Sequence, residues 1–242
     1  QRIQSTPQFQ AFQTSYTRNM ISLKEDFDLI IAGQVDGACD HLLSEAASLF
    51  ASKTSLELFD MIHTMRSVDD SVYAHSLNVA LISRAIGKWM QFSKEDLNTL
   101  TLAGLLHDIG KTQIPSEILN KQGKLTDEEF DIIRSHAKLG HKILKDTDLD
   151  LRIKLAALQH HERYDGSGYP RGLESDEIDT FASIVAIADV YAAMTAARSY
   201  RAPKCAFQVI AAFEDDGFQK YNPKVIFTFL QRVAACYNNS RV

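Results

Sequence analysis

The chain has 242 residues, of which 45% are hydrophobic and 24% are charged, and its formal net charge is −5. This composition is typical of a soluble globular protein with one large domain or two modest ones. An acidic chain lacks the broad basic surface that a long nucleic acid requires, so we exclude that class of partner. A small nucleotide in a locally basic pocket stays compatible with the charge.

Cysteine content and hydropathy indicate the compartment. Cys39, Cys205 and Cys236 are widely spaced and form no CxxC pair, which is typical of reduced, buried thiols in a cytosolic protein. No apolar run approaches the roughly 20 residues of a membrane span, and no signal peptide is recognisable. We therefore expect a cytoplasmic chain without membrane contact, and the start at Gln1 instead of Met suggests a piece of a longer protein.

The first quarter of the chain predicts helices but carries no cluster of catalytic residue types. Residues 1–16 are rich in Gln, Ser and Thr without strong hydrophobic periodicity, so we expect a loose lead-in. Apolar stripes at helical spacing follow over residues 19–50 and 56–65. We interpret residues 1–67 as a small helical module that serves dimerisation, giving a homodimer, or relays a signal.

The second predicted domain, residues 68–242, is also helical. One apolar helix runs into His107-Asp108 and must break at Gly110. Thr126 with Glu129 predicts a capping box at the start of another helix. Further helices are expected over 69–89, 151–161, 181–197, 206–213 and 223–236, with a loop over 164–172. Since no convincing alternating strand pattern occurs, the expected fold class is all-α, a helical bundle with a small N-terminal helical module.

Seven residues of metal-ligand type lie on or at the ends of apolar helices in this second domain: His75, His107, Asp108, His136, His160, His161 and Asp189. One such side chain would most often be a hydrogen-bonded core residue, but seven are hard to satisfy by ordinary hydrogen bonds. Divalent metal ions satisfy them at once, because imidazole and carboxylate are good ligands for first-row divalent ions. The pattern therefore predicts a metal cluster.

Adjacent ligand residues suggest two ions. Neighbours on a helix point about 100° apart, so His107 with Asp108, and His160 with His161, can each splay across two metal sites. Asp108 has two oxygens and can bridge both ions. Two ions roughly 3.5–4 Å apart can hold a bridging hydroxide that attacks phosphorus. Lys111, one short turn further on, can hold the phosphate, although a solvated loop lysine is an equal alternative.

The residues around these ligands resemble a known family. His107-Asp108 after an apolar helix, with earlier and later histidines and a late aspartate, is similar to the HD superfamily of metal-dependent phosphohydrolases. More narrowly, His-Asp-Ile-Gly-Lys at 107–111 and the segment HHERYDGSGYP at 160–170 resemble the HD-GYP subfamily in order and spacing. The resemblance covers about residues 68–237.

This resemblance implies a bacterial phosphodiesterase that opens cyclic di-GMP to pGpG and in some members continues to GMP. It implies two or three metal ions, with iron and manganese among the metals, and gives the ligand role to the seven residues named above. Asp108 and Lys111 would be catalytic, with Lys111 in contact with phosphate. The loop Gly168, Tyr169, Pro170 would shape the substrate side and bind partners such as GGDEF-type cyclases.

Several positions depart from the family pattern. Trinuclear members carry a glutamate one turn before the first ligand histidine, where this chain has Ser71, so we expect two metal ions. Ser183 and Ala192 replace the usual arginine and aspartate, which concerns the fit of the substrate more than metal binding. Arg198 and Arg201 are candidates for substrate contact, with a surface or salt-bridging role equally open.

Two other functions stay open at this point. One is a weakly active or inactive regulatory module that binds partners or nucleotide, and the other is a phosphodiesterase for another cyclic dinucleotide. The intact set of seven ligands argues against loss of activity. Among nearby polar residues, His141 matches no ligand position, Glu162 is expected to orient ligand imidazoles, and Asp165 is expected to structure the loop.

Overall fold

The computed structural model describes residues 6–50, 53–65, 71–195 and 206–238. Within these ranges every regular element is a helix, and extended pairing is limited to an isolated bridge between Asp165 and Glu174. The expected all-α fold class is confirmed. In the same part of the chain, no helix combines the length and the apolar character that crossing a bilayer requires.

The N-terminal part forms three helices: α1 (Pro7–Ile31), α2 (Val35–Phe50) and α3 (Ser55–Met65). The expected loose lead-in over residues 1–16 is wrong from Pro7 onward, because α1 already begins there. The Thr6 side chain caps this helix by accepting a hydrogen bond from the Phe9 amide at 3.2 Å, and proline suits the first helical position. The helix is held down because it buries Phe9, Phe12 and Tyr16 on one face.

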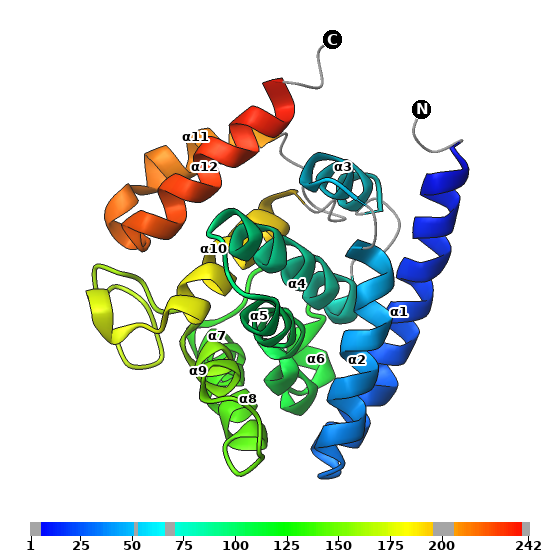
Figure 1. Ribbon diagram of the computed structural model, residues 1–242. Helices are drawn as coiled ribbons and strands as arrows, with labels where there is room; N and C mark the ends of the chain where they lie inside the picture. Colours follow the sequence, from blue (N-terminus) through cyan, green and yellow to red (C-terminus); the bar gives the residue numbers. More distant parts are fainter. Residues whose placement is uncertain (1–5, 51–52, 66–70, 196–205, 239–242) are drawn as a thin grey trace.

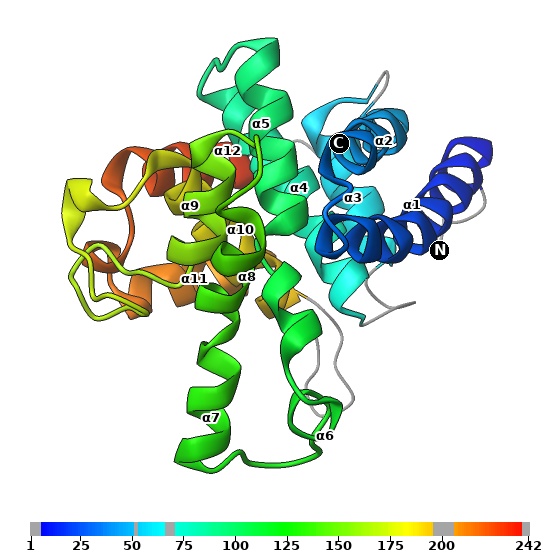
Figure 2. The same ribbon diagram turned by 90° about the horizontal axis from the view of Figure 1, so that it is seen from below.

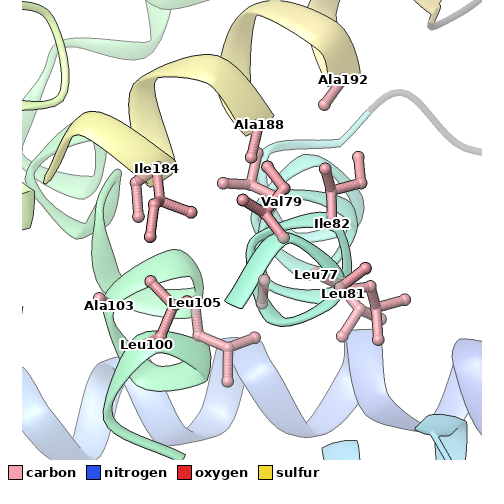
Figure 3. Close-up of a cluster of buried hydrophobic side chains, with 14 of the residues drawn as sticks. Leu77, Val79, Leu81, Ile82, Leu100, Ala103, Leu105, Ile184, Ala188 and Ala192 are labelled. Carbon is pink, nitrogen blue, oxygen red and sulfur yellow. The ribbon is translucent and has the colours of Figure 1, made fainter. Parts of the chain in front are cut away.

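Helix α4 (Val72–Trp89) runs through the middle of the bundle (Figure 1). It packs against α5 (Lys94–Leu106) and α10 (Thr180–Thr195), and Figure 3 shows the buried aliphatic side chains between them. A side chain at Gly104 of α5 would meet the Ala80 Cα at 2.6 Å, so glycine allows these two helices to touch through their backbones. This contact fixes the C-terminal end of α5 beside α4.

A short 3-10 helix (Ile109–Gln113) follows α5 and leads into α6 (Ser116–Leu119), α7 (Asp127–Arg134) and α8 (His136–Leu144). Figure 2 shows α6 and α7 projecting from the rest of the bundle. The predicted capping box at the start of α7 is confirmed: Glu129 N donates to Thr126 Oγ1, and Thr126 N donates to the Glu129 carboxylate. It ends the connection from α6 and fixes where α7 begins.

The C-terminal half adds α9 (Leu151–Gln159), the 3-10 helix Ser175–Glu177, α10, α11 (Ala206–Asp216), the 3-10 helix Phe218–Lys220 and α12 (Pro223–Asn238). Helix α9 lies against α5, α8 and α10, while α12 packs on α4 and α10. Five helices of the chain therefore pack together around the middle of the molecule: α4, α5, α8, α9 and α10.

The N-terminal helices share a continuous hydrophobic core with the helices that follow. The Tyr16 hydroxyl of α1 lies 2.9 Å from Asn78 Oδ1 and 3.2 Å from the Ala74 carbonyl of α4. The boundary predicted at residues 67 and 68 falls outside the described residues, and the division into two domains stays a prediction. What the structure adds is that α1 packs directly on the central helix.

Candidate metal centre

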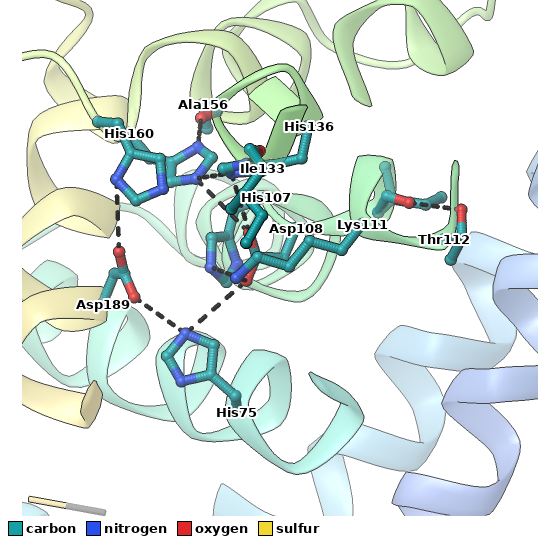
Figure 4. Close-up of polar contacts among 12 residues, drawn as sticks. His75, His107, Asp108, Lys111, Thr112, Ile133, His136, Ala156, His160 and Asp189 are labelled. Atoms are coloured by element: carbon teal, nitrogen blue, oxygen red, sulfur yellow. Dashed lines mark hydrogen bonds and ion pairs between the residues drawn. The ribbon is translucent and has the colours of Figure 1, made fainter. Parts of the chain in front are cut away.

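All seven predicted ligand residues converge on one place, although they come from five separate parts of the chain (Figure 4). They are His75 in α4, His107 and Asp108 just after α5, His136 at the start of α8, His160 and His161 just after α9, and Asp189 in α10. Most of them lie at helix ends, where the side chain can extend into the space between helices. The packing of α4, α5, α8, α9 and α10 therefore builds the site.

Asp108 lies at the centre of the cluster and is only 1% exposed. Its Oδ1 is 3.3 Å from His136 Nε2 and 3.7 Å from His160 Nε2. Its Oδ2 is 3.3 Å from His107 Nε2 and 3.9 Å from His75 Nε2. Burial alone would raise the pKa of this carboxyl group, but its electrostatic interactions with His107 and Lys111 hold it well below its usual range.

Two groups of ligand atoms share this carboxylate. One consists of His75, His107 and Asp108, and the other of Asp108, His136, His160 and His161, with the atoms of each group within 4.8 Å of one another. The expectation that His160 and His161 splay across two sites is therefore wrong, since both fall in the second group. The reason is that the two rings lie close together, with their centroids 4.1 Å apart, and that both reach Asp108 and His136.

Asp189 connects the two groups from the other side. Its Oδ1 lies 2.9 Å from His75 Nε2, and its Oδ2 lies 4.0 Å from His161 Nδ1. Burial would raise the pKa of Asp189, but the hydrogen bond and charge of His75 hold it well below the ordinary value. Both carboxylates are thus ionised at neutral pH in a largely buried place, which favours cations there.

The hydrogen bonds behind the rings set the direction of their lone pairs. The Nδ1 atoms of His107, His136 and His160 lie 2.8, 2.6 and 3.0 Å from the backbone carbonyl oxygens of Gly104, Ile133 and Ala156. Since a carbonyl can only accept, each Nδ1 carries the hydrogen, and each Nε2 presents a lone pair to the centre. This arrangement orients imidazoles as it does in metal sites.

The centre leaves polar atoms that the protein itself does not satisfy. His107 Nε2 and Asp108 Oδ1 are buried without a hydrogen-bond donor. The Nε2 atoms of His136 and His160 lie 3.2 Å apart although both are acceptors in these tautomers. Divalent cations resolve both problems, because a metal ion accepts lone pairs where no hydrogen is available. The donor set therefore fits metal ions.

Burial also keeps the second group ready to bind metal. It lowers the pKa of His136 to about 4 and lowers the pKa values of His160 and His161 as well. These imidazoles are neutral at physiological pH, and the neutral ring is the form that ligates.

Lys111 reaches into the centre from the 3-10 helix after α5. Its ammonium nitrogen lies 2.5 Å from Asp108 Oδ2 (Figure 4). The alternative of a fully solvated loop lysine is therefore wrong for this structure. A lysine held here places a positive charge beside the carboxylate that joins the two groups.

The signature loop after α9 covers one side of the centre. The Tyr169 ring stacks on His161 with centroids 4.7 Å apart and an interplanar angle of 23°. Glu162, only 3% exposed, accepts hydrogen bonds from the amides of Arg171 at 2.7 Å and Leu173 at 3.0 Å. The expectation that Glu162 orients the ligand imidazoles is wrong, because its carboxylate faces the backbone of its own loop. Glu162 instead holds the loop in place.

Other predicted positions have simple structural roles. Asp165 accepts hydrogen bonds from the Ser167 amide and hydroxyl, which confirms its loop-structuring role. Ser71 caps α4 by accepting a hydrogen bond from the Ala74 amide at 3.1 Å. His141 belongs to neither ligand group, as expected. Arg198 and Arg201 lie outside the described residues.

Sequence reasoning missed Arg134, the last residue of α7. Its guanidinium carbon lies 4.9 Å from the centroid of the Tyr169 ring and 4.9 Å from that of Phe130. The available signal was its position two residues before His136, but nothing in the helical pattern places it against a loop more than thirty residues away.

Comparison with known proteins agrees with this geometry. The sequence profile of the HD domain family matches residues 39–225, which include the five helices that build the centre together with all seven ligand residues. The chain belongs to the HD domain family. Its Gly168-Tyr169-Pro170 signature, absent from a bare His-Asp motif, places it in the HD-GYP branch.

Characterised relatives of this HD-GYP chain are named as phosphodiesterases of cyclic dinucleotides. It is 38% identical over 179 residues to a cyclic di-GMP phosphodiesterase of Thermotoga maritima, covering 73% of this chain and 48% of the relative. It is 40% identical over 149 residues to 3'3'-cGAMP-specific phosphodiesterase 1 of Vibrio cholerae, covering 60% of this chain and 35% of the relative. The chain thus spans half or less of the length of these relatives.

Solved structures support the helical HD-domain fold. Bd1817, described as an HDG"Y"P protein from Bdellovibrio bacteriovorus, superposes with a TM-score of 0.74 at 17% identity, over 91% of this chain and 70% of that one. The HD domain of the L. monocytogenes phosphodiesterase PgpH, solved with cyclic-di-AMP, superposes with a TM-score of 0.51 at 23% identity, over 77% and 96% of the two chains. At such identities the likeness concerns the fold alone.

Proposed function

We propose that this HD-GYP chain is a metal-dependent phosphodiesterase that hydrolyses cyclic di-GMP to pGpG and onward to GMP. The observation that carries the proposal is the Asp108 carboxylate, which lies between two groups of imidazole lone pairs and belongs to both. The names of the relatives supply the substrate class, since they act on cyclic di-GMP or 3'3'-cGAMP.

The proposed cofactors are two divalent metal ions, iron or manganese. His75, His107 and Asp108 would hold one ion, and Asp108, His136, His160 and His161 the other, with Asp189 completing the set through its contacts to both groups. When bound, such a pair supplies Lewis acidity that activates water and neutralises charge on a phosphate oxygen. Ser71 supports two ions over three, since its hydroxyl oxygen already caps α4.

The residues around the ligands would position the substrate. Lys111 would leave Asp108 and pair with the phosphate, as a compact ammonium point charge can do. The loop Gly168, Tyr169, Pro170 would form the wall of the substrate site beside His161. Arg198 and Arg201, which the structure does not describe, would also contact the substrate. These side chains bind and orient the phosphodiester, so their loss should act on binding and orientation while metal content is retained.

The direct test is turnover by the intact chain purified without oxygen and reloaded with iron(II) or manganese. We expect cyclic di-GMP to yield pGpG first and GMP later, with about two metal ions per chain by elemental analysis. Full metal occupancy without product from any cyclic dinucleotide would instead support the regulatory module. The Lys111→Met variant should keep its metal but lose turnover, with Lys111→Arg as the charge-preserving control.

A second candidate substrate is 3'3'-cGAMP, which the 40% identical relative from Vibrio cholerae is named for. The same metal-loaded protein should be offered both cyclic dinucleotides in competition. A preference of more than about tenfold in kcat/KM, or about 1.4 kcal/mol, would decide between them.

The proposed partners are GGDEF-type cyclases at the signature loop and a second copy of the chain at the N-terminal helices, in the cytoplasm. What supports self-association is the exposed apolar side chains of α1, among them Ile21, which is 62% exposed. Light scattering across a concentration series tests the homodimer, and an Ile21→Lys variant that remains as dimeric as the wild type would argue against this face.

A further inference from the structure

A row of stacked side chains leads from the metal centre to the outer face of α7. Tyr169 stacks on His161, and the guanidinium of Arg134 lies over Tyr169 with 4.9 Å between its carbon and the ring centroid. Phe130, one turn earlier on α7, also lies 4.9 Å from this guanidinium and is 45% exposed. The charge of Arg134 is thus held by two aromatic rings on one side of the centre.

The guanidinium is held in position without being neutralised. Arg134 forms an ion pair with Asp131 at 3.5 Å, and the two side chains are 44% and 73% exposed. An exposed pair at this distance contributes little, because water and salt screen it. Contact with the two rings holds the guanidinium beside the loop through attraction between the cation and the aromatic rings, and a guanidinium has N–H donors in a planar fork that matches phosphate oxygens.

The proposed substrate needs a cation at such a place. A cyclic dinucleotide has two phosphates in one ring, and when one of them is cleaved at the metal centre the other must lie away from it. Lys111 is already directed to the centre through Asp108. Arg163, the basic residue that follows Glu162 in the signature, donates to the backbone carbonyls of His160 and Glu162 at 3.3 and 2.9 Å.

We propose that Arg134 binds the second, uncleaved phosphate of the cyclic dinucleotide and that Tyr169 and Phe130 hold its guanidinium in place for this contact. This inference rests on the proposed function and adds a residue that distinguishes substrates with two phosphates from those with one. Arg134 is a binding residue in this role, and the reaction at the metal centre does not depend on it.

The test compares two substrates on the same metal-loaded chain. Cyclic di-GMP has two phosphates, while bis(p-nitrophenyl) phosphate has a single diester and no second phosphate to hold. In Arg134→Gln we expect KM for cyclic di-GMP to rise by about 10- to 100-fold, the effect of losing a hydrogen bond to a charged group, with kcat within about threefold. The kcat/KM for bis(p-nitrophenyl) phosphate and the metal content should stay unchanged.

Lys138→Gln is the matched control, because it removes one exposed positive charge a turn further along, on α8. It should leave KM for cyclic di-GMP within about twofold, as expected for an exposed charge that touches no substrate. Arg134→Lys should recover part of the loss, since it restores the charge without the planar fork. The KM of Arg134→Gln should also depend less on salt than that of the wild type.

Calorimetric binding of cyclic di-GMP to the chelated, metal-free chain separates this inference from the proposed function. If the wild type cleaves only bis(p-nitrophenyl) phosphate, the proposed function fails, and weaker calorimetric binding by Arg134→Gln still supports the contact. The inference is overturned if Arg134→Gln and Lys138→Gln have the same KM for cyclic di-GMP, or if Arg134→Gln lowers kcat/KM equally for both substrates. It is also overturned if a wild type that does not hydrolyse cyclic di-GMP does not bind it either.

Discussion

His136 and His160 face each other with their Nε2 atoms 3.2 Å apart, while the Nδ1 of each ring lies within 3.0 Å of a backbone carbonyl oxygen. With the hydrogens on Nδ1, two lone pairs are in contact inside a buried cluster. Such a contact is unfavourable in the protein alone and becomes favourable when a cation accepts both lone pairs. Metal binding should therefore stabilise the folded chain. Because Asp108 belongs to both groups of ligand atoms, we expect this stabilisation at each group.

Replacing Asp108 by Asn tests the shared carboxylate. The amide keeps the size of the side chain but has one oxygen and no charge, so we expect it to lose metal from both groups at once. Affinity should fall by more than about 100-fold, because even residues behind a ligand contribute 10- to 100-fold. Elemental analysis after dialysis measures the effect, and His141→Ala, outside both groups, is the control. Full metal occupancy in Asp108→Asn would show that the carboxylate does not bridge.

The metal-free protein should become less stable on acidification. Burial lowers the pKa of His136 to about 4, whereas an imidazole in the unfolded chain has a pKa of about 6.5. Between these values the unfolded state binds a proton that the folded state does not, so the free energy of unfolding falls as pH decreases. The slope is at most about 1.4 kcal/mol per pH unit for this residue.

Urea unfolding of chelated protein from pH 7 to pH 4 measures this slope. His136→Gln removes the titrating group and should flatten the curve, while His160 and His161, whose pKa values are also lowered, should leave part of the dependence in place. Since the charge of Asp108 raises the pKa of His107 despite burial, that residue contributes in the opposite direction, and the comparison of variants removes this contribution. A His136→Gln curve as steep as that of the wild type between pH 6.5 and pH 4 would contradict the assignment of a neutral His136.

The close approach of two backbone segments gives a prediction about Gly110. A Cβ atom there would collide with the carbonyl oxygen of His136 and with the Gly140 amide nitrogen, so alanine must push α8 away from the 3-10 helix. We expect Gly110→Ala to destabilise the fold by about 1–3 kcal/mol, as overpacking does, and to weaken metal binding because His136 moves. Denaturation and metal titration measure both effects.

Gly37 provides the matched glycine. It lies in α2, and a Cβ atom there meets nothing within 4 Å. Alanine at this position should raise stability by about 0.5–1 kcal/mol, since it restricts the unfolded chain. Equal effects of Gly110→Ala and Gly37→Ala would show that the contact with α8 does not constrain the centre.

The parts of the molecule that the sequence predicts are those governed by local rules. Thr126 and Glu129 make a capping box wherever they occur at this spacing, and an apolar run that ends in His107-Asp108 requires a helix end. The seven ligands could be gathered because each is a polar residue on an apolar helix, which is unusual for any one and decisive for the set. The resemblance to the HD-GYP subfamily, in the order and spacing of the motifs, then assigns the ligand role to these residues.

What the sequence could not predict depends on contacts between distant segments. Thr6 and Pro7 do signal a helix start, but the gain from burying Phe9 and Phe12 appears only when α1 meets the other helices. Glu162 was expected to face the imidazoles, yet the amides of its own loop satisfy its carboxylate. Arg134 reaches a ring from a segment beyond two intervening helices, which periodicity does not encode.

The contact between Tyr16 and α4 gives the last prediction, which concerns the N-terminal helices. The Tyr16 hydroxyl lies within hydrogen-bond distance of Asn78 Oδ1 and of the carbonyl of Ala74, the residue before His75. Tyr16→Phe leaves these buried acceptors without that donor, so we expect a loss of about 1–3 kcal/mol in the free energy of unfolding. Metal content should be unchanged, because the hydroxyl does not touch the ligands.

Tyr164→Phe is the control for the same chemical change. Its hydroxyl donates to Asp176 at the surface, so its removal should cost no more than about 0.5 kcal/mol. Chemical denaturation followed by both circular dichroism and intrinsic fluorescence checks the two variants. If Tyr16→Phe costs as little as Tyr164→Phe, the attachment of α1 to α4 depends on apolar packing alone. A clear difference would instead show a polar link from the N-terminal helices to the helix that carries His75.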